Sequence, residues 1–176
     1  MTDLLALDLV RQGLTTDQLV LTVGYDIENL SDPERRKLYS GSVVRDHYGR
    51  LIPKHAHGTA NLGCRTASTA KIVTAMMELF DRITDPNLLV RRVTLAACRI
   101  RPENEAEEPA FQQLDFYTSL PEQEKEAAAR QRERRRQEAE LRIKERFGKN
   151  AIFRGMNLKE GATTLDRNRQ IGGHKA

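Results

Sequence analysis

Residues 19–26, LVLTVGYD, alternate large apolar side chains with smaller or more polar ones. A period of two is typical of a β-strand, because successive side chains point to opposite faces of a sheet. The apolar side of this predicted strand consists of Leu19, Leu21, Val23 and Tyr25. The other side consists of Val20, Thr22, Gly24 and Asp26. The strand is therefore half-buried, and other segments must cover its apolar side.

Two amphipathic helices are predicted to supply that cover. Residues 2–12 place leucines at helical spacing, with Thr2 or Asp3 as the N-cap and Gly13 as the stop. Residues 68–85, STAKIVTAMMELFDRITD, have an N-cap in Ser68 and end before Pro86. The apolar stripe of this second helix is predicted to contain Val73, Met76, Met77, Phe80 and Ile83.

Two further strands complete the predicted sheet. Residues 55–63, HAHGTANLG, form a short strand of low apolar content, and residues 87–100, NLLVRRVTLAACRI, form another. In the latter, Val93, Leu95 and Ala97 oppose Arg92, Thr94 and Cys98. Residues 27–54 are interpreted as an elaborated loop with a hairpin around DHYG. The fold class is α+β: a small antiparallel sheet with two helices on one face and a polar second face.

Composition limits the class of protein. The chain has 176 residues, of which 31% are charged, and its net charge is +4. This balance predicts one small folded domain plus a solvated tail. No apolar run approaches the roughly 20 residues of a membrane helix, so no membrane partner is expected. Cys64 and Cys98 are widely separated, which indicates reduced thiols and a cytoplasmic location.

The polar sheet face suggests a nucleic-acid partner. Between Arg45 and Arg101 about ten Lys and Arg residues stand against about four acids. Aromatic side chains for base stacking are missing from the polar side of the strands, so sequence-independent phosphate contacts fit better. A solvated face without a ligand remains the alternative. A zinc site of His55, His57, Cys64 and Cys98 lacks the paired spacing of structural zinc ligands, so no metal site is predicted.

The order of four segments carries a resemblance to a known family. LVLTVGYD, KHAHGTANLG, STAKIVTAMMELFDRI and LLVRRVTLAACRI, followed by QQLDFYTS, resemble the C-terminal part of a Y-family translesion DNA polymerase of the UmuC-like type. The ending GKNAIFRGMNLKEGATTLDRNRQIGGHKA is similar to tails of this group. The resemblance implies a little finger domain that grips duplex DNA during error-prone synthesis past damage, in DNA repair and the SOS response. It also implies a nucleoid-associated location.

The resemblance has two departures. The catalytic core and its Mg²⁺ ligands are absent, so this chain alone is expected to be inactive, with no cofactor of its own. The family's little finger begins with a strand before its first helix, whereas here that strand is apparently missing and an unpaired edge is expected. The chain is therefore interpreted as a C-terminal piece or an internal-start product, whose partners include the catalytic core of the parent polymerase.

Two sets of candidate binding residues follow. The residues expected to contact DNA are Lys54, His57, Thr59, Asn61, Arg65, Arg91 and Arg92. In the family, a peptide after the little finger commonly binds the sliding clamp, and its pattern is matched by Gln113, Leu114, Asp115, Phe116 and Tyr117. Phe and Tyr replace the family's Leu and Phe at the last two positions. An extended peptide of this kind fills a preformed pocket with its apolar side chains.

The C-terminal third is predicted to be a long charged helix and a flexible tail. Ser119 with Glu122 forms a capping box, Gly148 ends the helix, and Ala128, Leu141 and Phe147 form a thin apolar stripe. Such a helix is expected to be a solvated spacer. The predicted units are a DNA-binding domain at 1–102, a linker at 103–120, the helix at 121–148 and the tail at 149–176. The alternative function is a non-enzymatic helical adaptor or scaffold.

Overall fold

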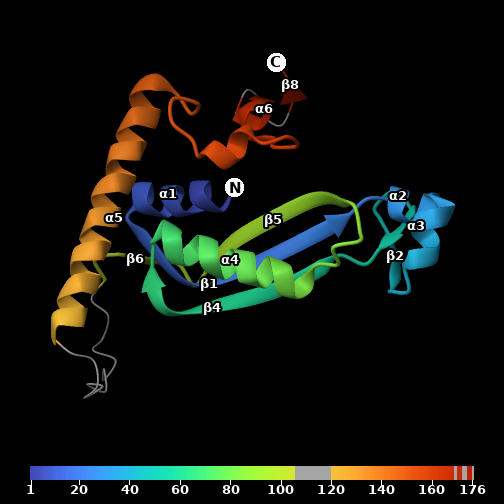
Figure 1. Cartoon of the computed structure of the whole chain (residues 1–176), viewed down its shortest axis with the longest axis horizontal. Coiled ribbons are helices and arrows are strands. Elements are labelled where there is room, and N and C mark those ends of the chain that lie inside the picture. The colour runs from blue at the N-terminus through green and yellow to red at the C-terminus, as the bar shows by residue number, and fades with distance from the viewer. Residues whose placement is uncertain (106–119, 169, 172–173, 176) are drawn as a thin grey trace.

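The computed structural model describes residues 1–105, 120–168, 170–171 and 174–175 (Figure 1). The first half of the chain contains α1 (Thr2–Gln12), β1 (Leu14–Tyr25), α2 (Glu28–Ser31), α3 (Pro33–Leu38), β2 (Val43–Arg45), β3 (Leu51–Pro53), β4 (Ala56–Thr66) and α4 (Thr69–Ile83). The second half contains β5 (Val90–Cys98), β6 (Arg101–Pro102), α5 (Leu120–Phe147), a 3₁₀ helix (Gly155–Leu158), α6 (Thr164–Asn168), β7 (Gln170–Ile171) and β8 (His174–Lys175).

The main sheet is antiparallel, with β1 at its centre and β4 and β5 on either side, while β6 pairs with the start of β1. Thr22 of β1 lies between His57 of β4 and Thr94 of β5, and this register defines the rows across the sheet. The predicted α+β class with a small antiparallel sheet is confirmed. The strand β1 begins at Leu14, five residues before the predicted start, because the turn at Gly13 leads directly into it.

The core lies between the sheet and the two helices α1 and α4, which cover one face (Figure 1). The apolar side of β1 is buried as predicted, with Leu19 and Val23 completely inaccessible. From α4, Ile72, Met76 and Leu79 pack into the same cluster. Burial of these side chains is the main stabilising contribution to the domain, at about 1.5 to 3 kcal/mol for each large one.

Two details of the helices differ from the prediction. The buried stripe of α4 runs through Ile72, Met76 and Leu79, whereas Met77 is 53% exposed. The apolar residues of this helix span more than one face, so the pattern alone left its rotation ambiguous by about one residue. At α1 the N-cap position is Met1, without a side-chain cap, and Asp3 instead accepts hydrogen bonds from the backbone N–H of Leu4 and the amino terminus.

The loop between β1 and β4 contains the predicted hairpin, β2 paired with β3, and two short helices that were not predicted. Asn29 of α2 is completely buried. Its side-chain amide donates to the carbonyls of Asp26 and Leu89, and its Oδ1 accepts from Leu89 N–H. One asparagine thus joins the loop to the chain just before β5, because each of its polar groups has a backbone partner.

The helix α5 has the predicted length and ends at Gly148, whose φ is 93°. The expectation of a solvated spacer is wrong. Gln137 is only 4% exposed, and its amide donates to Ala67 O and Thr69 Oγ1 at 2.8 Å each. Leu141 packs against the core, and α5 contacts α1. The capping box at Ser119 lies outside the described residues.

The segment after α5, predicted as a flexible tail, folds into short elements in its described part. Lys144 Nζ donates to Ile152 O at 2.6 Å, which folds the chain back along α5. Arg154 lies 3.8 Å from Asp3 of α1, and Asn168 donates to Asn150. A polar sequence without periodicity gives no signal from which contacts of this kind can be predicted. No helix in the described part of the chain is long and apolar enough to cross a membrane.

Candidate nucleic-acid interface

The sheet face opposite α1 and α4 bears small and polar side chains, because the strand alternation that buries one side exposes the other. From β1 this open face receives Gln18, Val20, Thr22 and Gly24, from β4 His57, Thr59 and Asn61, and from β5 Arg92, Thr94, Ala96 and Cys98. We call this set the open face. All three strands lie wholly within the described residues, and this set includes no carboxylate and no large aromatic side chain.

Side chains on the open face are held by one another across the strands. Thr22 Oγ1 lies 2.9 Å from His57 Nδ1, and Gln18 Nε2 donates to Asn61 Oδ1 at 3.0 Å. These contacts join β1 and β4 at directly opposed positions of the register. These polar side chains are therefore partly oriented before a ligand binds. Less side-chain entropy is then lost on binding.

Carboxylates at the two ends of the open face are each paired with an arginine. At one end, Asp17 lies 3.3 Å from Arg65, whose guanidinium also donates to Arg99 O at 2.7 Å. At the other end, Asp26 pairs with Arg91 at 3.1 Å. A hydrogen bond from Glu28 N–H and the neighbouring Arg91 hold the pKa of Asp26 below its ordinary value. Each of these two negative charges is therefore offset by a neighbouring cation.

The structure brings four of the seven predicted DNA-contacting residues onto the open face: His57, Thr59, Asn61 and Arg92. Lys54 is exposed just before β4. Arg65 is engaged with Asp17 and Arg99 O, and its side chain is only 19% exposed. Arg91 lies at a register shift opposite Gly24 and Tyr25 and points to Asp26.

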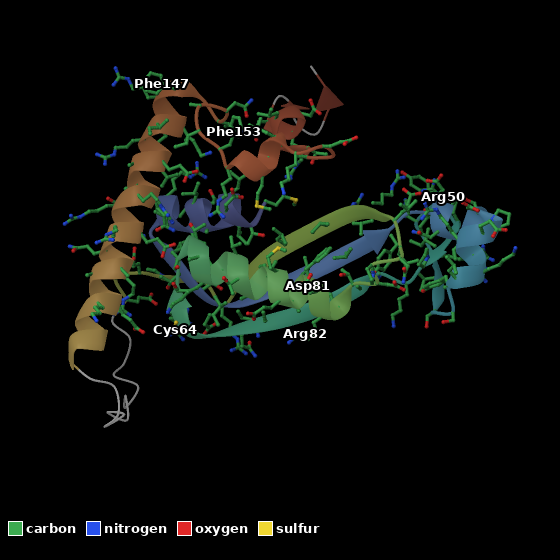
Figure 2. The ribbon with its side chains drawn as sticks, in the orientation of Figure 1. Arg50, Cys64, Asp81, Arg82, Phe147 and Phe153 are labelled. Atoms are coloured by element: carbon green, nitrogen blue, oxygen red, sulfur yellow. The ribbon has the colours of Figure 1, made fainter. Side chains whose placement is uncertain are left out.

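The expected concentration of positive charge on the open face is wrong. Of the cations counted between Arg45 and Arg101, only Arg92 belongs to the face. Arg50 lies in the β2–β3 hairpin at one end of the molecule (Figure 2). Arg82 belongs to α4, on the opposite layer, and donates to Thr59 O at the edge of β4. A count along the sequence adds charges from different layers, whereas the fold separates them.

A second concave region, which sequence reasoning missed, lies where the sheet ends against α5. It is a cleft of about 580 Å³, and its charged lining includes Arg65, Arg101, Glu103, Arg130, Glu133 and Arg134. Arg134 pairs with Glu103 at 2.8 Å, and Glu133 accepts from Ser68 Oγ and from Ala70 N–H. Several of the charged side chains that line the cleft therefore bind one another or the backbone, and these contacts attach α5 to the domain. The arginine run at 132–136 was the only sequence signal for this contact.

Two other sets of residues concern metal binding and clamp binding. Within the described residues, no three His, Cys, Asp or Glu side chains come together in a way that would hold a metal ion. Cys64 is exposed with its sulfur 3.6 Å from Lys71 Nζ, and Cys98 belongs to a different strand. The clamp-binding peptide, Gln113 to Tyr117, lies outside the described residues.

Comparison of the chain with protein-family models, with curated proteins and with solved structures finds no match. Function must therefore be argued from the chain's own geometry.

Proposed function

We propose that this chain is a DNA-binding part of a Y-family translesion polymerase, equivalent to the little finger domain, and that it contacts the phosphate backbone of duplex DNA through the open face. The observation that carries the proposal is the absence of carboxylates from the open face in β1, β4 and β5, together with the pairing of Asp17 and Asp26 at its ends. A polyanion meets no unpaired negative charge there.

The chemistry of the open face suits phosphate oxygens. Arg92 supplies a guanidinium, and Thr59, Thr94 and Asn61 supply uncharged hydrogen-bond donors. Contacts of this kind position a duplex without reading its bases, which is what a polymerase acting on any sequence requires. The low charge of the face predicts modest affinity, in keeping with a module that works together with a separate catalytic core.

In this proposal polymerisation belongs to that core. Phosphoryl transfer by polymerases needs carboxylates that hold Mg²⁺ ions. Asp26, two residues before Glu28, is a carboxylate near the end of β1, but it already pairs with Arg91 and accepts a hydrogen bond from Glu28 N–H. We expect no nucleotide incorporation by this chain alone. The peptide Gln113 to Tyr117 would tether the assembly to the sliding clamp.

Duplex DNA titrated by fluorescence anisotropy at several salt concentrations tests the proposal. The wild-type chain is expected to bind at low salt, with affinity falling as salt rises. Arg92→Gln with Thr94→Val should weaken binding several-fold and reduce the salt dependence. The matched control is Lys71→Gln with Thr74→Val, the same changes at exposed positions of α4 on the opposite layer, and it should bind like wild type.

Two results would count against the proposal. Equal effects of the sheet variant and the α4 variant would mean that the open face has no special role. Complete lack of binding at low salt would favour the helical adaptor, whose partner would be another protein. The buried position of Gln137 argues against that alternative, because the side of α5 that contains it already packs against this chain and cannot bind another protein.

A further inference from the structure

The outer side of α5 carries a row of four arginines that the proposed function does not use: Arg132, Arg135, Arg142 and Arg146. All four are exposed, and none forms an ion pair with a carboxylate among the described residues. We call this row the arginine stripe. At 1.5 Å of rise per residue it extends over about 21 Å of helix.

From residue 125 to residue 147, the charges of α5 are sorted by side. With about 100° of rotation per residue, the four arginines lie on the half of the helix opposite the buried Gln137. The carboxylates between residues 125 and 147 all lie within about 100° of the Gln137 direction; they are Glu126, Glu133, Glu138, Glu140 and Glu145. A helix stabilised for solvent alone would alternate the two signs at i,i+4 spacing on its outer face.

Three of the four cations nearer the domain side are, in contrast, paired with carboxylates, while the fourth, Arg130, lines the cleft and forms no ion pair among the described residues. Arg134 pairs with Glu103 at 2.8 Å and with Glu138 at 3.1 Å, and Lys144 lies 3.3 Å from Glu140. Arg136 lies 3.7 Å from Glu133. Because these pairs cancel, the uncompensated charge of α5 is concentrated on the outward side, where nitrogen-tipped side chains project away from the sheet (Figure 2).

The arginine stripe stands on a fixed support. Gln137 is hydrogen-bonded to the residues that lead into α4, and Glu133 accepts from Ser68 Oγ at 2.6 Å and from Ala70 N–H at 2.9 Å. Leu141 packs into the core from the same helix. Docking of α5 therefore fixes, relative to the sheet, the backbone positions from which the four arginine side chains extend.

We propose that the arginine stripe is a second binding surface for the phosphate backbone of nucleic acid, separate from the open face. Guanidinium groups are well suited to phosphate, since their planar donors bind its oxygens in pairs. An anionic membrane would need an apolar side next to the charges. Here Leu141 of α5 lies in the core, and Phe147, on whose ring Arg146 stacks, is the one exposed large apolar residue among the described side chains of the helix.

The test replaces Arg132, Arg135, Arg142 and Arg146 with Gln, which keeps helix propensity similar and removes four charges. The control removes four exposed cations elsewhere, with Arg36→Gln, Lys37→Gln, Arg45→Gln and Lys159→Gln. Duplex DNA affinity is measured against salt. If all four arginines reach phosphates, the slope of log K against log salt should shrink by about 3 to 4 in the stripe variant. The control should keep the wild-type slope.

Paired variants keep the test decisive if the fourfold variant loses helix by circular dichroism. Arg132→Gln with Arg135→Gln, and Arg142→Gln with Arg146→Gln, should each give about half of the change in slope. Equal slopes for the stripe variants and the control would overturn the proposal. So would binding of the wild-type chain to phosphatidylserine vesicles without binding to DNA.

The outcome is independent of the open face. In the background of Arg92→Gln with Thr94→Val, the stripe variant should still lower affinity further. If only the stripe variant matters, the proposed role of the open face fails and this inference stands. If only the sheet variant matters, the inference fails and the proposed function stands.

Discussion

Gly58 lies where α4 crosses β4, and a side chain at this position would crowd the helix. A Cβ at this position would lie 2.9 Å from Leu79 Cδ1 and 3.0 Å from Ile83 Cγ2. Leu79 is 1% exposed, so it cannot easily move aside. The absence of a Cβ lets the helix approach the strand closely.

Replacing Gly58 with Ala is therefore expected to lower the free energy of unfolding by about 1 to 2 kcal/mol through overpacking. Urea denaturation measures the change. The control is Gly155→Ala, where a new Cβ would have no neighbour within 4 Å. A Gly58→Ala protein as stable as the control variant would show that α4 is less tightly packed than described.

Asp26 predicts a pH dependence of stability. Its folded-state pKa is lowered from 3.8, first by the hydrogen bond from Glu28 N–H and further by Arg91. A depressed pKa means that the unfolded state takes up the proton first as the pH falls. The stabilising contribution is complete above the unfolded-state pKa and is lost as the pH falls through the folded-state pKa.

Comparison of wild type with Asp26→Asn isolates this contribution. The difference between their free energies of unfolding should be constant near neutral pH and should shrink below about pH 4. Asp3 and Asp46 also have a lowered pKa, but both are present in the two proteins, so their effects cancel. A difference that stays constant down to the acid limit would contradict the assigned ion pair.

At the scale of the element, the rotation of α4 decides which of two adjacent methionines is part of the core. Met76 is 3% exposed and Met77 is 53% exposed. Met76→Ala should lower the free energy of unfolding by about 2 to 4 kcal/mol through lost burial and a cavity. Met77→Ala should change it by less than about 0.5 kcal/mol. Thermal or urea unfolding of the two variants measures this contrast, and comparable losses would mean that the helix is rotated.

The docking of α5 depends on one buried amide. Gln137→Ala removes two hydrogen bonds and leaves Ala67 O and Thr69 Oγ1 without that partner. We expect a loss of about 1 to 3 kcal/mol and faster amide hydrogen exchange along α5. Gln131→Ala, an exposed position on the same helix, serves as control. Unchanged exchange in the Gln137 variant would mean that α5 is held by other contacts.

At the scale of the whole molecule, the helix layer covers one sheet face, while α5 rises along one end of the sheet and presents the arginine stripe (Figure 1). The open face and the stripe are thus carried by different elements of the same folded body. If both surfaces bind DNA as proposed, their contributions to the binding free energy for duplex DNA should add, because distant residues that share no partners usually behave independently.

Clamp binding should be separable from DNA binding in the same way. Replacing Gln113, Leu114 and Phe116 with Ala removes the hydrogen-bonding and apolar groups that would fill a clamp pocket. Loss of clamp pull-down, with unchanged affinity for duplex DNA, is the expected result. Replacing Gln112 and Thr118 with Ala, which flank the peptide, is the control. Wild-type clamp capture by the triple variant would remove the peptide hypothesis.

The sequence predicted most of the secondary structure because its periodic patterns are local. The alternation from Leu19 to Tyr25 and the cap at Ser68 depend on neighbours in the chain, and both are confirmed. The two short helices before the hairpin were missed, since Asn29 obtains its partners from Leu89, sixty residues away. The rotation of α4 was missed because several of its sides are apolar.

The candidate site was predictable only in part. His57, Thr59 and Asn61 were predicted to contact DNA, and the register places all three on the same side of β4. The ion pairs of Arg65 and Arg91 join residues distant in sequence, so a count of charges could not reveal that these cations are occupied.

By itself, the sequence determined the α+β class, the buried side of β1 and the polar character of the opposite side, because alternation and helical periodicity act over a few residues. Only the tertiary structure decided which charges are neutralised and where α5 lies. A buried glutamine and paired arginines depend on partners brought together by the fold, and their energies depend on burial that the sequence does not specify. The arginine stripe became visible as a surface only when Gln137 showed which side of the helix faces inward.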